Sequence, residues 1–306
     1  MHSIAIAGMG RMGANMALRL VSKGIRPVVW NRTPEKAAAL AAKGAEPAAA
    51  LSELVGKLKA PRAVWMMLPA GQPTEDLFLS LLSLLQKGDL IIDGANGNWN
   101  DAVRRAGKAA ESGIDFLDAG VSGGIWGREN GYCIMAGGPA ASFGKAEPFL
   151  KALCQEGGYM RCGGPGAGHF TKMVHNGIEY AMMEAYGEGF ELLKASPFGE
   201  MDMAGLASVW NHGSVVRSWL LELAQNAFDK DPKLENIAGV VPDSGEGRWA
   251  VEEAARLGVP LPAISVSLFK RFRSQMKDDF GDRLSAALRR EFGGHEVKER
   301  PEGKGS

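Results

Sequence analysis

The first half of the chain alternates short apolar runs with longer segments of helical periodicity. Strand-like runs read SIAIA, PVVW, AVWMML, DLIID and GIDFLDA, and helix-like segments at 11–23, 33–43 and 73–86 lie between them. YCIMAG, the segment 140–153 and GGYMRCGG continue the alternation to about residue 163. Because strands that alternate with helices are typical of parallel sheets with crossover connections, we predict an α/β, Rossmann-type doubly wound parallel sheet.

Helical periodicity dominates the second half. It covers 169–194, 202–210, 215–228, 247–257 and 264–277, after the glycine-rich GGPGAG at 163–168. The 306 residues also fit two domains better than one, since about 150 residues make an ordinary domain. We therefore predict two domains, 1–164 and 165–306, of which the second is all-α and ends in a polar tail after Gly294.

Composition and charge remove several classes of protein. Lysine plus arginine equals aspartate plus glutamate at 35 each, so no net charge attracts nucleic acid or an anionic membrane. The three cysteines lack metal-ligand spacing, which favours buried free thiols, a reducing compartment and no metal. Neither a signal sequence nor an apolar run of about 18 residues is found, which predicts a cytoplasmic protein.

The segment GMGRMG at 8–13 follows the first strand-like run and opens a helix. In this context the glycines permit a tight turn and let the backbone approach a pyrophosphate, while the helix amides face the anion. A purely structural glycine turn is the alternative. The motif favours a dinucleotide cofactor, and the residues expected to contact it are Gly8, Gly10, Met12 and Gly13.

The residues after PVVW indicate which nicotinamide cofactor binds. A carboxylate there would hold the ribose 2′-hydroxyl of NAD, but this chain has Asn31, Arg32 and Thr33. A guanidinium and a hydroxyl suit a 2′-phosphate, so NADP is preferred and NAD stays possible. Alternatively, Arg32 is an ordinary solvated loop residue. Leu68, which ends AVWMML, and Pro69 are also expected to contact the cofactor.

A polar stripe marks the segment KMVHNGIEY at 172–180. On a helix Lys172, Asn176 and Glu179 project within about 60° of one another, opposite Val174 and Ile178. Such a stripe usually faces water. Here it follows one glycine-rich loop and accompanies another, VSGGIWGRENGY, at the end of a strand-like run. Because ligands bind at the carboxyl ends of parallel strands, these features favour a substrate site over a solvated face.

Three sequence features together resemble the 6-phosphogluconate dehydrogenase family, a branch of the β-hydroxyacid dehydrogenase superfamily. They are VSGG at 121–124, the pattern G-x-x-x-K-x-x-x-N at 168–176, and KMVHNGIEY, of which HNGIEY is specific to the phosphogluconate branch. The resemblance covers nearly the whole chain. It implies oxidation of the 3-hydroxyl of 6-phosphogluconate by hydride transfer to the cofactor, then loss of carbon dioxide to give ribulose 5-phosphate.

The resemblance also implies roles for individual residues. Lys172, with a lowered pKa, takes the hydroxyl proton and then polarises the 3-keto oxygen, Asn176 orients the hydroxyl, and Glu179 protonates C1 of the enediol. The substrate carboxylate is held by Ser122, Gly123 and Gly124. Asn96, in IIDGANGN, contacts both cofactor and substrate, and His175 either contacts substrate or only lies beside the stripe. His169 is expected to cap or pack.

The phosphate of such a substrate needs cations, and the candidates are Arg271 and Arg289, with Tyr180 donating a hydroxyl. The segment 289–295, ending at His295, resembles the one that long family members extend into a partner subunit, so we expect a homodimer or a dimer of dimers. Arg289 follows Arg271 by only eighteen residues, which indicates the short form of the family, without the large helical insert.

One departure and two rival functions remain at this point. Ser244 and Glu246 stand where long members place a lysine and a threonine, and Glu246 cannot bind a dianion, which leaves Arg248 as a compensating contact. A dehydrogenase or reductase of a small 3-hydroxy acid, of the 3-hydroxyisobutyrate or tartronate semialdehyde type, would need Lys172 and Asn176 alone. A non-catalytic NADP-binding regulator would need no lysine.

Overall fold

The computed structural model describes residues 3–276, 280–294 and 296–298. The described chain divides into two compact units: Met1–Glu179 with Glu252–Leu257, and Tyr180–Val251 with Gly258–Ser306. The division falls within one helix, α8 (Ala167–Lys194). The expected domain boundary between 164 and 165 stays a prediction.

In the described part of the first unit, eight strands form one sheet in the order β3-β2-β1-β4-β5-β6-β7-β8. Their bounds are β1 Ser3–Ala7, β2 Val28–Trp30, β3 Glu46–Pro47, β4 Arg62–Met66, β5 Leu90–Asp93, β6 Asp115–Ser122, β7 Tyr132–Gly137 and β8 Cys154–Gly163. Along the chain, β2 and β3 are added on one side of β1 and the later strands on its other side, as in a doubly wound sheet. The predicted Rossmann-type fold is therefore confirmed.

One strand runs against the prediction of parallel pairing. β6 pairs with β7 in the antiparallel sense, whereas the other neighbouring strands are parallel. The connection between them, residues 123–131, contains only a 3-10 turn η2 (Gly124–Trp126) and a short helix α6 (Gly127–Asn130). A parallel partner needs a crossover of a dozen residues or more, and this connection is too short for one.

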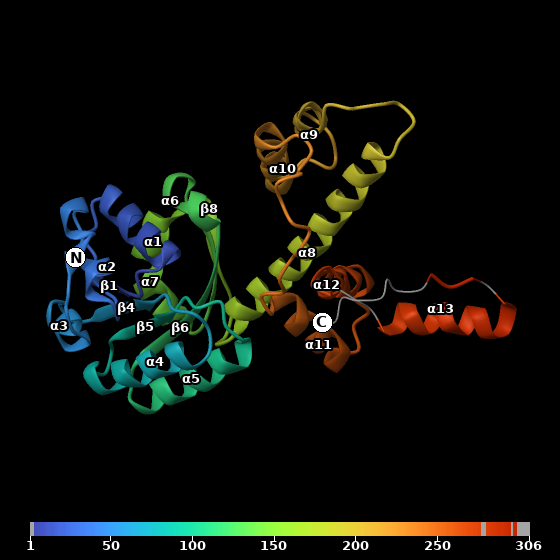
Figure 1. Ribbon diagram of the computed structural model, residues 1–306. Coiled ribbons are helices and arrows are strands. Elements are labelled where there is room, and N and C mark those ends of the chain that lie inside the picture. The colour runs from blue at the N-terminus through green and yellow to red at the C-terminus, as the bar shows by residue number, and fades with distance from the viewer. Residues whose placement is uncertain (1–2, 277–279, 295, 299–306) are drawn as a thin grey trace. The chain divides into compact units, whose positions relative to one another are not determined.

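Helices cover both faces of the sheet (Figure 1). On one face α1 (Arg11–Ser22) and α7 (Ala140–Leu153) bury Met16, Leu20, Phe149 and Leu150 against the strands. The other face carries α3 (Leu51–Gly56), α4 (Gln72–Leu84) and α5 (Trp99–Glu111). Of the expected helices, 33–43 is interrupted, forming α2 (Pro34–Ala38) and the 3-10 turn η1 (Ala41–Lys43).

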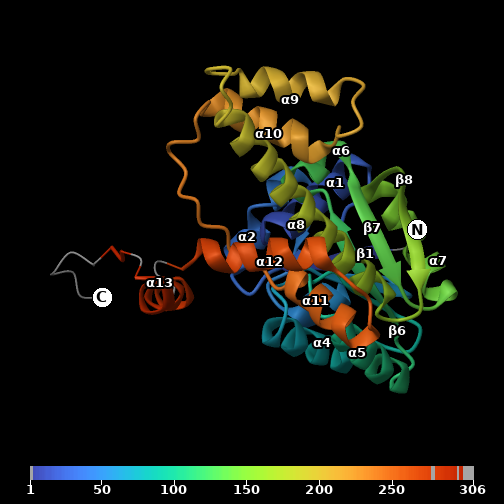
Figure 2. The same cartoon turned by 90° about the vertical axis from the view of Figure 1, so that its right-hand side faces the viewer.

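The described part of the second unit contains only helices, which confirms the predicted all-α character. After α8 come α9 (Met203–Asn211), α10 (Trp219–Lys230), α11 (Glu246–Leu257), α12 (Pro262–Ser274) and α13 (Phe280–Gly293). α9 and α10 pack side by side near the end of α8 (Figure 2), around a small core of Phe190, Ala207, Leu221 and Phe228. α10 begins later than expected because the Ser218 side chain accepts a hydrogen bond from the Leu221 amide and caps it.

Two further expectations concern the whole chain. The three cysteines are free, but only Cys154 is buried; Cys133 is exposed and Cys162 is half-buried. Burial raises the pKa of the Cys154 thiol to about 12. Within the described ranges, none of the helices combines the length and the apolar character that crossing a bilayer would require.

Candidate active site

The turn after β1 has room only for glycine at two of its positions. Gly8 has a φ of +107°, and a Cβ there would lie 2.3 Å from the carbonyl oxygen of Met67. A Cβ on Gly13 would lie 1.9 Å from the oxygen of Gly8. Gly10 faces open space and caps α1 without a side-chain hydrogen bond, so the amides of the first turn can bind an anion.

A cavity of about 320 Å³ adjoins this turn. It brings together six residues that the sequence assigned to the cofactor: Gly10, Met12, Gly13, Leu68, Pro69 and Asn96. Arg11, Met67, Gly94 and Val121 also line it; Met67, Gly94 and Val121 lie at strand ends, the signal that could have found them. An open glycine turn with uncapped helix amides beside this cavity fits the pyrophosphate of a dinucleotide.

Asn31 has a structural role that its sequence position did not reveal. Its Oδ1 accepts a hydrogen bond of 2.9 Å from the amide of Met9, and its Nδ2 donates to the carbonyl of Thr33 at 3.0 Å. The side chain therefore ties the glycine turn to the end of β2. Arg32 and Thr33 are exposed, and neither lines the cavity.

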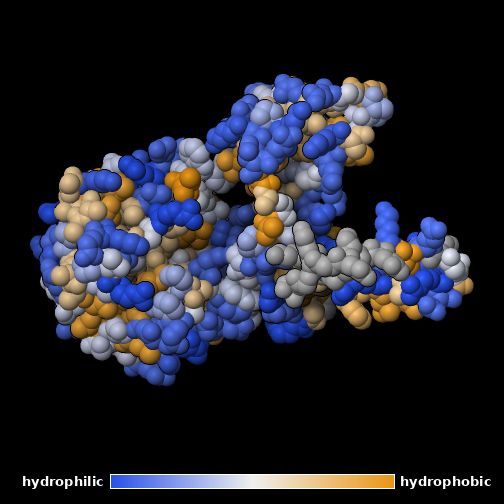
Figure 3. Space-filling model, in the orientation of Figure 1, coloured by the Kyte–Doolittle hydropathy of each residue, from blue (hydrophilic) through white to orange (hydrophobic). Residues whose placement is uncertain are grey.

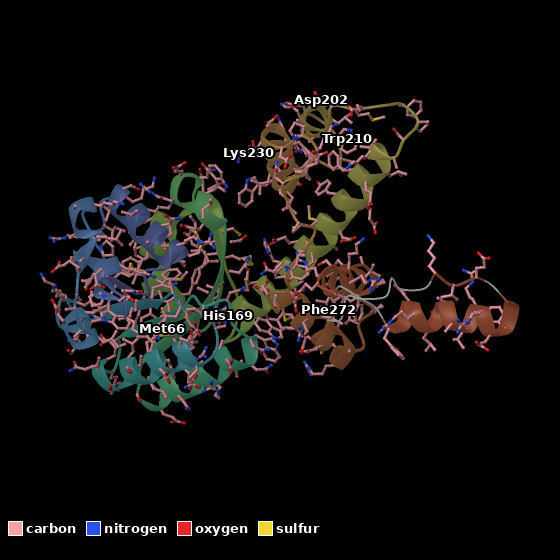
Figure 4. The ribbon with its side chains drawn as sticks, in the orientation of Figure 1. Met66, His169, Asp202, Trp210, Lys230 and Phe272 are labelled. Atoms are coloured by element: carbon pink, nitrogen blue, oxygen red, sulfur yellow. The ribbon has the colours of Figure 1, made fainter. Side chains whose placement is uncertain are left out.

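A buried carboxylate fixes the start of α8. Asp118, in β6, is fully buried, and its two oxygens accept hydrogen bonds from the amides of Gly166 at 2.7 Å and His169 at 2.8 Å. A negative charge at a helix N-terminus is stabilising. His169 lies in the first turn of α8 (Figure 4), buried, with its Nε2 3.1 Å from the Asp93 carbonyl oxygen, so it packs as expected.

Two of the three residues of the polar stripe of α8 are buried. Lys172 and Asn176 are 8% and 9% exposed, whereas Val174 and Ile178 are 39% and 51% exposed. The usual reading, in which the stripe faces water, is therefore wrong for these two residues. Gly120 of β6 makes room for the lysine, since a Cβ there would lie 2.3 Å from the Cβ of Lys172. A buried lysine is rare outside functional sites and ion pairs.

His175 joins Lys172, Asn176 and Ser122. Its Nδ1 lies 3.0 Å from Oδ1 of Asn176 and 3.5 Å from Nζ of Lys172, and its Nε2 lies 3.3 Å from Oγ of Ser122. Nδ1 can donate to the amide oxygen or accept from the lysine, depending on the tautomer. The group thus places a base, an imidazole and a hydroxyl together, next to the glycines that follow Ser122.

Glu179 lies further along α8, and the two expected arginines belong to the second unit. Glu179 follows Lys172 by seven residues on α8, about 10 Å along the axis, and is half-buried. In the second unit, the Arg271 guanidinium lies 3.3 Å from the centroid of the Tyr180 ring, which brings these two expected residues together. Arg289 lies exposed on α13, and His295 lies outside the described residues.

In the loop before α11, the groups expected to bind phosphate are bonded to other residues of the protein. The Tyr180 hydroxyl donates to Oδ1 of Asp243 at 3.2 Å and lies 3.1 Å from Oγ of Ser244. Arg248, the expected compensating cation, forms an ion pair of 2.9 Å with Asp243. Glu246 is buried. The described residues contain no cluster of His, Cys, Asp or Glu able to hold a metal ion.

Models of known families match both parts of the chain. Residues 3–164 match the NAD binding domain of 6-phosphogluconate dehydrogenase, and residues 168–302 match the 6-phosphogluconate dehydrogenase C-terminal domain. The Bacillus subtilis (strain 168) protein YqeC is 42% identical, over 97% of this chain and 99% of its own length. An NAD(+)-dependent, decarboxylating 6-phosphogluconate dehydrogenase of Haloferax volcanii is 39% identical, over 96% of this chain and 98% of its own.

Longer relatives and solved structures are similar as well. The chain spans 62% of the NAD(+)-dependent, decarboxylating enzyme of Bacillus subtilis, at 35% identity, but nearly the full length of the two relatives above, which agrees with the predicted short form. The Plasmodium falciparum 6-phosphogluconate dehydrogenase, studied with NADP+ and with 6-phosphogluconate, superposes with a TM-score of 0.81 at 29% identity, over 99% of this chain and 67% of that one. With both domains matched and the glycine turn in place, this chain belongs to the 6-phosphogluconate dehydrogenase family and is an NAD(P)-dependent dehydrogenase.

Proposed function

We propose that this chain oxidises and decarboxylates 6-phosphogluconate to ribulose 5-phosphate and carbon dioxide. The observation that carries the proposal is the buried polar stripe of α8, because a lysine and an amide withdrawn from water beside Ser122 suit a hydroxy acid. The Haloferax volcanii and Bacillus subtilis relatives named decarboxylating support the second half of the reaction.

In the oxidation, the neutral amine of Lys172 takes the proton of the substrate 3-hydroxyl, which Asn176 orients. A bound nicotinamide would supply the acceptor for the hydride that leaves C3. His175 lies between Lys172 and Ser122, so its two nitrogens can hold a proton for either group. The hydroxyl of Ser122 and the amides of Gly123 and Gly124 bind the substrate carboxylate.

In the decarboxylation, Lys172, now protonated, donates to the 3-keto oxygen while the bond to the carboxylate carbon breaks. The electron pair of that bond forms the enediol, and Glu179 then protonates its C1. The two groups serve adjacent carbons, so the side chains of Lys172 and Glu179 must converge on the ligand from backbone positions about 10 Å apart along α8. Arg271, Tyr180, Arg289 and His295 bind the phosphate in this proposal.

The cofactor preference and the oligomer are part of the same proposal. Arg32 and Thr33 are exposed beside the glycine turn and can bind a 2′-phosphate, so NADP is preferred over NAD. A homodimer or a dimer of dimers is supported by exposed apolar positions on α13, among them Phe280 and Leu284. Figure 3 shows hydrophobic side chains along one edge of that helix.

The purified protein with 6-phosphogluconate and each cofactor tests the reaction. We expect reduced nicotinamide and carbon dioxide in equal amounts, with the higher kcat/KM for NADP. Formation of reduced nicotinamide without carbon dioxide would contradict the proposal and favour a dehydrogenase of a small 3-hydroxy acid. A higher kcat/KM for NAD would contradict only the proposal that Arg32 binds the 2′-phosphate of NADP.

Two variants test the residues. Lys172→Met should lower the rate of hydride transfer by at least about a hundredfold, because the hydroxyl proton loses its acceptor. Glu179→Gln should slow the later protonation more than hydride transfer, as measured by single-turnover absorbance and carbon dioxide release. Lys145→Met, which removes a lysine paired with Asp115 in the first unit, is the matched control. Near-normal turnover in Lys172→Met would contradict the assigned role.

A further inference from the structure

Arg19 of α1 is buried without a carboxylate partner. Its side chain is 6% exposed, and among the described residues it forms no ion pair. Its donors go to backbone oxygens instead: Nε to Leu153 at 2.6 Å, Nη1 to Arg128 at 3.0 Å and Glu129 at 3.1 Å, and Nη2 to Cys154 at 3.4 Å. Burying a guanidinium is costly unless such bonds compensate it.

These carbonyl groups come from two helix ends. Leu153 ends α7, and Arg128 and Glu129 lie in α6. The last carbonyl groups of a helix lack partners within it, and a cation there satisfies them. A single side chain of α1 thus binds the end of α7 and two carbonyl groups of α6, a four-residue helix that could not persist alone.

α6 belongs to the segment 122–131, which begins with the proposed carboxylate-binding residues. Asn15, one turn before Arg19 on α1, donates from Nδ2 to the carbonyl of Ile125 at 3.4 Å. At the far end, a Cβ on Gly131 would lie 2.8 Å from Nη2 of Arg19, so the guanidinium lies directly against the backbone. From the other side, the Tyr132 ring fills the space beside Gly127.

The helix α1, which carries Asn15 and Arg19, starts at the glycine turn of the cofactor site. Gly10 caps α1, and Asn15 and Arg19 follow on successive turns of it. Val121, which precedes Ser122, lines the cofactor cavity. One rigid element therefore carries both the turn that fits the pyrophosphate and the contacts that hold the segment 122–131.

We propose that Arg19, assisted by Asn15, is a positioning residue for the reaction. It fixes the segment 122–131 on α1 and so sets where Ser122 and the following amides hold the substrate carboxylate relative to the cofactor cavity. This inference rests on the proposed function for the identity of the substrate. It needs only a hydroxy acid whose carboxylate binds at Ser122.

The test compares Arg19→Met, Arg19→Lys and Asn15→Ala with Arg62→Met. Arg62 is the control, because it is an arginine of the first unit that is partly buried and is paired with a carboxylate, Asp89, at 2.9 Å. The measurements are the KM and kcat for the hydroxy acid, the Kd for the nucleotide, the Tm, and hydrogen exchange of peptides covering 122–131.

In Arg19→Met we expect kcat/KM for the hydroxy acid to fall by about tenfold to a hundredfold, with the nucleotide Kd unchanged and faster exchange in 122–131. Arg19→Lys should lie between it and the wild type, because an ammonium cannot reach both helix ends at once. Asn15→Ala should raise the KM with little change in Tm. Arg62→Met should lower the Tm and leave the KM unchanged.

An Arg19→Met protein that loses Tm as Arg62→Met does, with unchanged KM and exchange, would overturn the proposal and leave Arg19 a purely structural clamp. If Arg19→Met does not fold, unchanged KM values in Arg19→Lys and Asn15→Ala would overturn it equally. Should the wild type oxidise a different 3-hydroxy acid, the proposed function fails, and the same comparison on that acid decides the role of Arg19.

Discussion

At the scale of single residues, the loop that carries Asn96 depends on a charged network outside the cavity. Asp93 ends β5 and accepts a hydrogen bond from the Ala95 amide at 3.1 Å. Arg105 donates to Asp93 at 2.8 Å and to Glu75 at 3.0 Å, so α5 connects β5 to α4. Because both Asp93 and Arg105 are buried, the loss of one partner leaves an uncompensated charge.

Glu75 in this network makes stability depend on pH. The hydrogen bonds from Arg104 and then Arg105 outweigh burial and lower the pKa of Glu75 from 4.5 to about 2. A carboxyl whose pKa is lower in the folded state stabilises the fold above its unfolded pKa, and this contribution is lost as the pH falls towards the folded pKa.

We therefore expect Glu75→Gln to lower the free energy of unfolding by up to about 3 kcal/mol at pH 7. The difference from wild type should be constant above about pH 5 and should shrink between pH 4.5 and 2. Urea unfolding at several pH values measures it. The control is Glu156→Gln at an exposed position, and a pH-independent difference for Glu75→Gln would contradict the assignment.

At the scale of elements, close packing between β6 and α8 sets the position of Lys172. Gly120→Ala would place a methyl group 2.3 Å from the Cβ of Lys172, so the helix must move away. We expect a loss of about 1–3 kcal/mol of stability and a lower kcat. Gly187→Ala, in the same helix with nothing within 4 Å, should instead stabilise by about 0.5–1 kcal/mol.

Thermal unfolding and steady-state kinetics of both variants check this pair. Gly120→Ala with wild-type kcat would show that Lys172 tolerates a shift of its helix. Loss of stability in Gly187→Ala would show that α8 is packed at that position, contrary to the open space around it.

Sequence periodicity was sufficient for most elements, since the predicted helix at 140–153 coincides with α7 and every predicted strand is present. It could not predict that β7 runs antiparallel to β6, which follows from the short connection between the two strands. It also could not find Asp118 or Arg19, because their partners are backbone groups far along the chain. The buried stripe of α8 contradicts simple amphipathicity, and only the surrounding glycine loops indicated it.

At the scale of the whole molecule, the helix α13 has no buried residue in the single chain. All fourteen of its residues are described, and none is buried. Phe280, Leu284 and Leu288 follow at intervals of four and are 71%, 48% and 53% exposed, so they form one apolar face. A helix of this length is marginal in water without packing, which supports a second copy of the chain as its partner.

We expect Leu288→Glu to disrupt that assembly, because a carboxylate on the apolar face would have to be buried in the contact. Light scattering should show the wild type at a multiple of 32.5 kDa and the variant shifted towards the mass of one chain. Ser285→Glu adds the same charge beside this face and should leave the mass unchanged. A wild type at 32.5 kDa would refute the oligomer, whereas equal masses for wild type and Leu288→Glu would place the contact elsewhere. If Arg289 acts from a partner subunit, dissociation should also raise the KM for 6-phosphogluconate, since the phosphate loses one cation while the acid–base group of Lys172 stays intact.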